Sequence, residues 1–121
     1  MLEKQRVHFA RVLAQIGNIN REEQKFLFLD EAVSHLDLKH QRQLLDIARN
    51  LCSHGVTVIA ILHDINLALS YADHILFMRD GMIVHEIFSH GELTNAMIKD
   101  VFDIDVRIIQ PAGETRPVVI Y

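Results

Sequence analysis

The sequence of 121 residues is poor in the residue types that mark several specialised classes of protein. It contains one cysteine, no tryptophan, two prolines and five glycines. A single cysteine cannot form an internal disulfide, so we expect the fold to be held by an apolar core, as in proteins of a reducing cytosol. We predict that this residue, Cys52, lies buried on a helix face, where free cysteines usually sit.

The sequence also lacks long apolar runs and an excess of positive charge. No stretch approaches the roughly 20 apolar residues that cross a bilayer. The formal net charge is −4 and the isoelectric point is about 6.0, whereas a nucleic-acid-binding domain usually carries a basic patch. Half of the residues are hydrophobic and 23% are charged, which is typical of a globular domain. We therefore expect a globular protein without a nucleic-acid partner.

Two short apolar segments with a helical pattern between them predict a βαβ unit. Residues 26–29 (FLFL) and 56–62 (VTVIAIL) are short and uniformly apolar, so we predict two strands that are each buried on both faces. Residues 38–53 place apolar side chains at helical spacing, with Asp37 as the N-cap and Gly55 at the closing end. A strand, a helix and a strand joined by short loops form a right-handed parallel unit.

Polar side chains follow both predicted strands. Asp30 and Glu31 come directly after the first strand, and His63 and Asp64 directly after the second. Because the carboxyl ends of parallel strands meet at one edge of a sheet, where open α/β sheets bind ligands, we expect these side chains to converge. Carboxylates at the end of a buried strand indicate a cation, since an unneutralised buried charge is unfavourable. Each residue also has a structural interpretation: Asp30 as a turn cap, Glu31 as a solvated side chain, and Asp64 as a helix cap.

The rest of the sequence predicts further helices and antiparallel strands. Asp80-Gly81 is a typical two-residue hairpin turn between apolar segments. His85 and His90 are five residues apart across a strand and a turn, so they lack the helical spacing of a two-histidine zinc site. The remaining predicted elements are helices at 3–16, 65–72 and 92–102 and two weak tail strands, DVRIIQ and RPVVIY.

Three segments together resemble the ATPases of ATP-binding-cassette (ABC) transporters. FLFLDEAVSHLD (26–37) resembles their Walker B motif and D-loop, and VIAILHDINLALSYADHILFMRDG (58–81) resembles their H-loop and the segment beyond it. EKQRVHFARVLAQI (3–16) resembles the helix that follows their LSGGE signature motif. The resemblance runs in order from Glu3 to about Phe102. The stretch HDINLALSYADHI is most similar to importers of heme, iron–siderophore complexes or cobalamin.

The resemblance implies a partial P-loop NTPase (RecA-like) α/β core, with a parallel sheet flanked by helices and a C-terminal β-hairpin and helix. The Walker A strand and loop and the helical subdomain would be missing. Residues 1–121 would form a single partial domain. Its segments would be the post-signature helix (1–17), Walker B and the D-loop (26–37), the H-loop strand (56–64), and the C-terminal hairpin, helix and tail (74–121).

The resemblance also implies roles for residues in hydrolysis. Asp30 would hold Mg²⁺ through water, Glu31 would act as the general base on the attacking water, and His63 would contact the γ-phosphate. Phosphoryl transfer depends mainly on charge neutralisation and a positioned nucleophile, which these side chains could supply.

Three further residues are assigned to nucleotide binding by the resemblance. Asp37 would reach across a dimer interface to the partner subunit. Ser34 lies in the segment that resembles the D-loop, and Glu3 lies where the signature motif resumes. Helix capping is an equally good explanation of Asp37 and Ser34.

The implied function is that of a part of the ATP-hydrolysing subunit of an ABC importer. With ATP and Mg²⁺ as cofactors, it would couple hydrolysis to uptake of heme or an iron chelate across the inner membrane. The implied partners are a second ATPase subunit, in a head-to-tail homodimer, and the transmembrane permease subunits. The protein would be peripheral, on the cytoplasmic face of that membrane.

The sequence departs from the family at positions that bear on activity. The phosphate-binding loop G-x-x-x-x-G-K-S/T is absent from the sequence, although its backbone N–H groups and lysine supply most of the hold on a nucleotide. Ala32 and Val33 replace the usual Pro-Thr, and His35 replaces the usual Ala. We therefore expect the 121-residue chain alone neither to bind nor to hydrolyse ATP. The alternative function is a stand-alone, non-catalytic interaction module that docks on intact ABC ATPases.

The absent Walker A strand also has a consequence for the fold. In the family it lies between the strands predicted here at 56–62 and 74–79, so both would have an unpaired edge. Such edges recruit other strands. We expect one of three outcomes: direct pairing of the two strands, pairing between two chains, or poor solubility.

Overall fold

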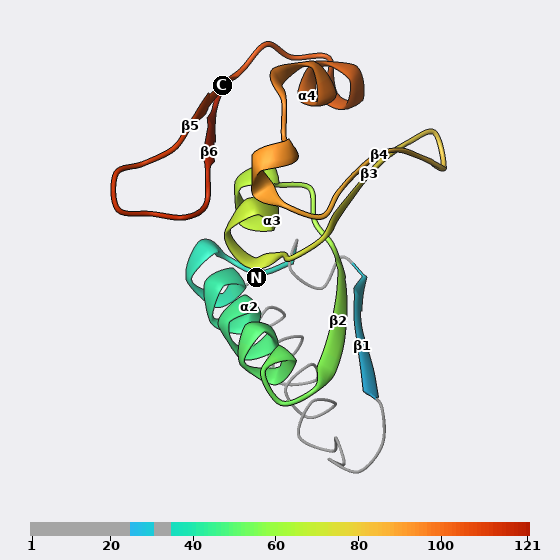
Figure 1. The fold of residues 1–121 in the computed structure, drawn as a ribbon. Coiled ribbons are helices and arrows are strands. Elements are labelled where there is room, and N and C mark those ends of the chain that lie inside the picture. Colours follow the sequence, from blue (N-terminus) through green and yellow to red (C-terminus); the bar gives the residue numbers. More distant parts are fainter. Residues whose placement is uncertain (1–24, 31–34) are drawn as a thin grey trace. The chain divides into compact units, whose positions relative to one another are not determined.

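The computed structural model describes residues 25–30 and 35–121. The helix predicted at residues 3–16 lies outside these ranges. The chain divides into two compact units, the first ending at His63 and the second beginning at Asp64. The elements are β1 (Lys25–Asp30), α2 (Leu38–Cys52), β2 (Val56–Ile61), α3 (Ile65–Tyr71), β3 (Ile75–Arg79), β4 (Met82–Ile87), the 3₁₀ helix η1 (His90–Glu92), α4 (Asn95–Phe102), β5 (Arg107–Ile109) and β6 (Val118–Ile120) (Figure 1). None of the helices in the described ranges is long and apolar enough to cross a membrane.

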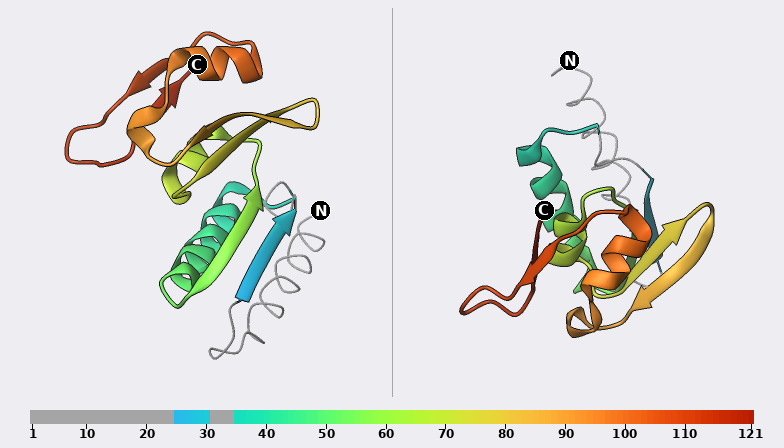
Figure 2. Two further views of the ribbon diagram at one scale, coloured as in Figure 1. Left: turned by 45° about the vertical axis from the view of Figure 1, so that its right-hand side comes forward. Right: turned by 90° about the horizontal axis from the view of Figure 1, so that it is seen from above.

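The first unit contains the predicted βαβ arrangement. Strands β1 and β2 run parallel and in register, from Lys25 opposite Val56 to Asp30 opposite Ile61. Helix α2 connects them and contacts β2, and both figures show it alongside the pair of strands (Figures 1 and 2). The prediction of a parallel pair joined by one helix is therefore confirmed.

The prediction that both strands are buried on both faces is wrong. On β1, Leu27 and Leu29 are buried, whereas the alternate side chains are open to solvent. Successive side chains of a strand point to opposite faces, and a uniformly apolar segment does not reveal which face is packed. We call the open side of the β1–β2 sheet the apolar sheet face; its large apolar side chains are Phe26 (66% exposed), Phe28 (57%), Ile59 (48%) and Ile61 (41%).

Helix α2 begins and ends close to its predicted bounds. Asp37 is the N-cap, and its side chain accepts a hydrogen bond from the backbone N–H of His40. The helix ends at Cys52, and Gly55 adopts a φ of +88° in the turn that leads to β2, a conformation that favours glycine. Cys52 is only partly buried, which corrects the prediction of a core cysteine, because it lies in the last turn of the helix.

The second unit begins with α3 and the predicted hairpin. Strands β3 and β4 are antiparallel, and Asp80 and Gly81 between them have φ values of +53° and +78°. Two positive φ angles are the signature of a type I′ turn, so the hairpin prediction is confirmed. Helix α4 starts later than predicted, at Asn95, because Thr94 caps it by accepting a hydrogen bond from the Met97 N–H.

The tail forms the two predicted strands in shortened form, and β5 and β6 pair antiparallel. Within the described residues, each of the three sheets has two strands, and β3 pairs with β4. Direct pairing of the strands predicted at 56–62 and 74–79, which belong to different units, stays a prediction. The core of the second unit draws on its helices, the β3–β4 hairpin and the tail, and consists of Ile65, Leu69, Ile75, Phe77, Ile87, Leu93, Ile98, Val106 and Val119.

Candidate functional site

Two of the predicted site residues leave the same edge of the β1–β2 sheet. Asp30 is the last residue of β1 and pairs with Ile61, the last residue of β2. His63 follows Ile61 by two residues and is the final residue of the first unit. The carboxyl end of a parallel pair is where open α/β sheets bind ligands, so this edge is the candidate site. Glu31, Ser34 and Glu3 lie outside the described residues.

Asp64 serves as a helix cap. Its Oδ1 atom accepts hydrogen bonds from the backbone N–H groups of Asn66, at 2.8 Å, and Leu67, at 3.3 Å. These are donors that the first turn of α3 would otherwise leave unsatisfied. The interpretation of Asp64 as a helix cap is therefore confirmed. Asp64 is also the first residue of the second unit.

Asp37 is also held as a cap. Its Oδ1 atom accepts a hydrogen bond from the His40 N–H at 2.9 Å and lies 2.8 Å from Nδ1 of the same histidine. The backbone hydrogen bond from His40 is the main reason why the pKa of Asp37 lies below its ordinary value, because it favours the charged form. The capping interpretation therefore applies, and the contact with a partner subunit stays a prediction.

The candidate edge suits a cation with oxygen ligands. Among the residues that the structure describes, no group of three or more His, Cys, Asp and Glu side chains could hold a metal ion. Mg²⁺, however, usually keeps several waters and is bound by one or two carboxylates together with substrate phosphates. The Asp30 side chain is exposed at the end of β1, which fits this mode of binding.

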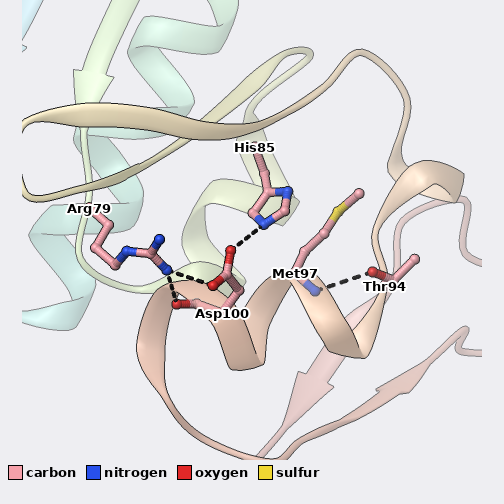
Figure 3. A network of polar contacts seen from close by, with 5 residues as sticks. All are labelled: Arg79, His85, Thr94, Met97 and Asp100. Atoms are coloured by element: carbon pink, nitrogen blue, oxygen red, sulfur yellow. Dashed lines mark hydrogen bonds and ion pairs between the residues drawn. The ribbon is translucent and has the colours of Figure 1, made fainter.

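A polar network that the sequence did not predict joins the β3–β4 hairpin to α4 (Figure 3). One oxygen of Asp100 accepts a hydrogen bond from Arg79 at 2.6 Å, and the other lies 2.7 Å from Nε2 of His85. Arg79 also donates to the main-chain carbonyl of Asp100 at 2.6 Å. The hydrogen bond from Arg79, followed by the contact with His85, lowers the pKa of Asp100. His85, considered above as a zinc ligand, is therefore a partner of this carboxylate.

A second unpredicted set of contacts holds the tail against α3. The Asn66 side chain bonds both main-chain polar groups of Val119. Arg116 donates to the carbonyls of Leu69 and Ala72 near the end of the helix. These partners are 44 to 53 residues apart in the sequence, so no local pattern could have indicated them.

No protein-family model matches the chain. Its curated relatives include proteins named hemin import ATP-binding protein HmuV. The relative from Hahella chejuensis is 44% identical over 117 residues, which is 97% of this chain and 46% of that protein. The relative from Aliivibrio fischeri is 44% identical over 100 residues (83% and 38%), and that from Deinococcus radiodurans is 40% identical over 118 residues (98% and 44%). The chain thus spans less than half the length of these relatives.

Proposed function

Since this chain belongs to the ATP-binding subunits of ABC transporters and corresponds to a carboxyl-terminal part of one, we propose that it supplies the hydrolytic edge of an importer ATPase. The complete subunit hydrolyses ATP and couples this reaction to uptake of heme or an iron chelate. Relatives that are named for hemin import support the choice of cargo.

One observation carries the proposal. Asp30 and His63, which lie 33 positions apart in the sequence, follow two paired parallel strands at their common carboxyl edge. In a βαβ unit the two parallel strands end at the same edge of the sheet, so both residues lie at that edge. We infer that β1 and β2 are neighbouring strands of a RecA-like P-loop sheet.

The proposed roles follow from the chemistry of each side chain. Asp30 provides carboxylate oxygens for Mg²⁺, which neutralises phosphate charge when it is bound. Glu31, which directly follows Asp30 in the sequence, accepts a proton from the attacking water through its carboxylate. His63 donates a hydrogen bond toward the γ-phosphate from the neighbouring strand.

The proposal also includes contacts beyond this edge. Asp37, Ser34 and Glu3 would contribute to nucleotide binding, with Asp37 reaching a second ATPase subunit in a head-to-tail homodimer. The complete subunit would bind permease subunits at the cytoplasmic face of the inner membrane. The 121-residue chain would be inactive alone, because its sequence contains no phosphate-binding loop.

A fusion protein provides the test. The amino-terminal part of the Hahella chejuensis relative would be joined to this chain where the similarity begins, and ATP binding and hydrolysis would be measured. Glu31→Gln should retain binding and lower turnover by roughly a hundredfold or more, because the amide cannot accept a proton. His63→Ala should lower turnover more than affinity. The control is Glu114→Gln, the same change at an exposed position of the tail.

Two results would count against this function. One is a fusion protein in which Glu31→Gln turns over ATP at the unsubstituted rate. The other is micromolar binding of Mg-ATP by the 121-residue chain alone in a calorimetric titration, since that would mean that the missing loop is not needed.

The apolar sheet face favours a second candidate, the non-catalytic module that docks on intact ABC ATPases. Four large apolar side chains exposed on one sheet face are typical of an interaction surface. If the chain is a module, it should alter the ATPase rate of the intact Hahella chejuensis protein when added in trans, and Phe28→Ser should abolish that effect. A chain that leaves the rate unchanged would reject this candidate.

A further inference from the structure

The last residues of the chain bind both ends of α3. At its first turn, the Asn66 side chain donates to the Val119 carbonyl at 3.0 Å and accepts from the Val119 N–H at 2.8 Å. At its other end, one guanidinium nitrogen of Arg116 lies 2.9 Å from the Leu69 carbonyl and 2.7 Å from the Ala72 carbonyl. We call residues 116–120 the tail strap.

The strap is part of the packed core and not a loose surface segment. Val119 is 2% exposed and belongs to the same core cluster as Ile65 and Leu69 of α3. Helix α3 has only seven residues, and a helix of this length is unstable without tertiary contacts. The strap therefore stabilises α3 by apolar packing and by hydrogen bonds at both ends.

In the sequence, α3 begins two residues after His63 of the candidate edge. The main-chain N–H of Asn66 bonds Asp64, the N-cap, while its side chain bonds the strap. His63 directly precedes Asp64. Tyr121, which follows the strap, is 70% exposed, and partial desolvation and the negative charge of Asp64 raise its pKa.

We propose that the tail strap positions His63: Asn66 and Arg116 fix α3 and its Asp64 cap, and thereby fix the backbone from which His63 extends. This inference rests on the proposed function, in which His63 contacts the γ-phosphate. Asn66 and Arg116 are positioning residues, because they act through the main chain of α3. Arg116 also lies 3.1 Å from Nε2 of His90 and 3.6 Å from a carboxylate oxygen of Asp73.

The test uses nuclear magnetic resonance of the 121-residue chain without nucleotide. In Asn66→Ala, amide exchange at positions 66 and 67 should rise roughly five- to tenfold, the effect of losing one or two hydrogen bonds. The imidazole resonance of His63 should shift or broaden at the same time. The control is Asp100→Asn, which breaks the polar network of the same unit without touching the strap and should leave the His63 resonance unchanged.

Arg116→Lys provides a milder variant in case Asn66→Ala does not fold. A lysine keeps the charge but replaces the rigid, planar guanidinium with one ammonium group on a flexible side chain, which holds the two carbonyls less firmly. The same changes should therefore appear, but smaller in size. An unchanged His63 resonance in both strap variants, or an equal change in Asp100→Asn, would overturn the proposal.

The fusion protein separates this inference from the proposed function. Asn66→Ala should lower kcat severalfold and leave the KM for ATP within about twofold, since a displaced His63 affects hydrolysis more than binding. If the His63 resonance moves but kcat does not, the strap positions His63 and it is the role of His63 in hydrolysis that fails.

Discussion

Single carboxylates in this chain are bound by several donors at once. Asp100 binds Arg79 and His85 with separate oxygens, and Asp37 binds the main chain and the side chain of His40 with one oxygen. In both, hydrogen bonds to the charged form lower the pKa of the carboxyl group. At the residue scale, Asp37 and Asp100 stabilise local structure through these partners, whereas Asp30 ends a strand at the candidate edge.

The first prediction concerns pH and Asp100. Because its pKa in the folded protein is lowered from the ordinary value of 3.8, its charge stabilises the second unit above about pH 4, and this contribution is lost as the pH falls through the lowered pKa. Asp100→Asn should therefore reduce the thermal midpoint at pH 7 and have a smaller effect near pH 3. Thermal unfolding at both values of pH measures the difference.

A matched control for this prediction is Asp105→Asn. The Asp105 side chain is 93% exposed and lies 3.5 Å from Lys99, an arrangement that usually contributes little. Equal effects of the two substitutions at pH 7 would show that the Arg79–Asp100–His85 network does not stabilise the unit.

At the scale of elements, features set by residues close together in the sequence were predicted better than contacts between distant residues. Asp37 and Asp80-Gly81 mark a helix start and a turn through contacts within three residues, and both are confirmed. The packed face of β1 could not be predicted, because four consecutive apolar residues carry no alternation. The shared edge of Asp30 and His63 was predicted from chain order alone, whereas the contact of Asn66 with Val119 spans 53 positions and leaves no local pattern.

The second prediction concerns the hairpin turn. A Cβ atom at Gly81 would meet no heavy atom within 4 Å, but its φ of +78° is a conformation that side chains rarely adopt. Gly81→Ala should therefore destabilise the second unit by about 1 kcal/mol through backbone strain alone. Gly91→Ala is the control, because a Cβ there makes only an ordinary contact with the Ser89 Oγ at 3.9 Å. Denaturant unfolding that gives the two variants equal stability would contradict the assignment of a type I′ turn.

At the scale of the whole molecule, the described residues expose an apolar face and open strand edges on the β1–β2 sheet. The chain spans less than half the length of its relatives, and the apolar sheet face is open in the described structure. Within the described residues the β1–β2 sheet has two strands, so each strand has one edge without a strand partner. Apolar faces and open edges of this kind promote association.

The third prediction is that the 121-residue chain associates with itself as its concentration rises. Sedimentation velocity from micromolar to millimolar concentration should show a growing fraction of dimers or larger species. Phe28→Ser should reduce this fraction without unfolding the chain, because the Phe28 side chain is already 57% exposed and the folded state loses little apolar burial. Ile83→Ser changes a side chain of similar exposure, 56%, on the β3–β4 hairpin, and should have a smaller effect.

If the unsubstituted chain stays monomeric at millimolar concentration, the apolar sheet face does not drive association. If both variants reduce the associated fraction equally, the association is not specific to that face.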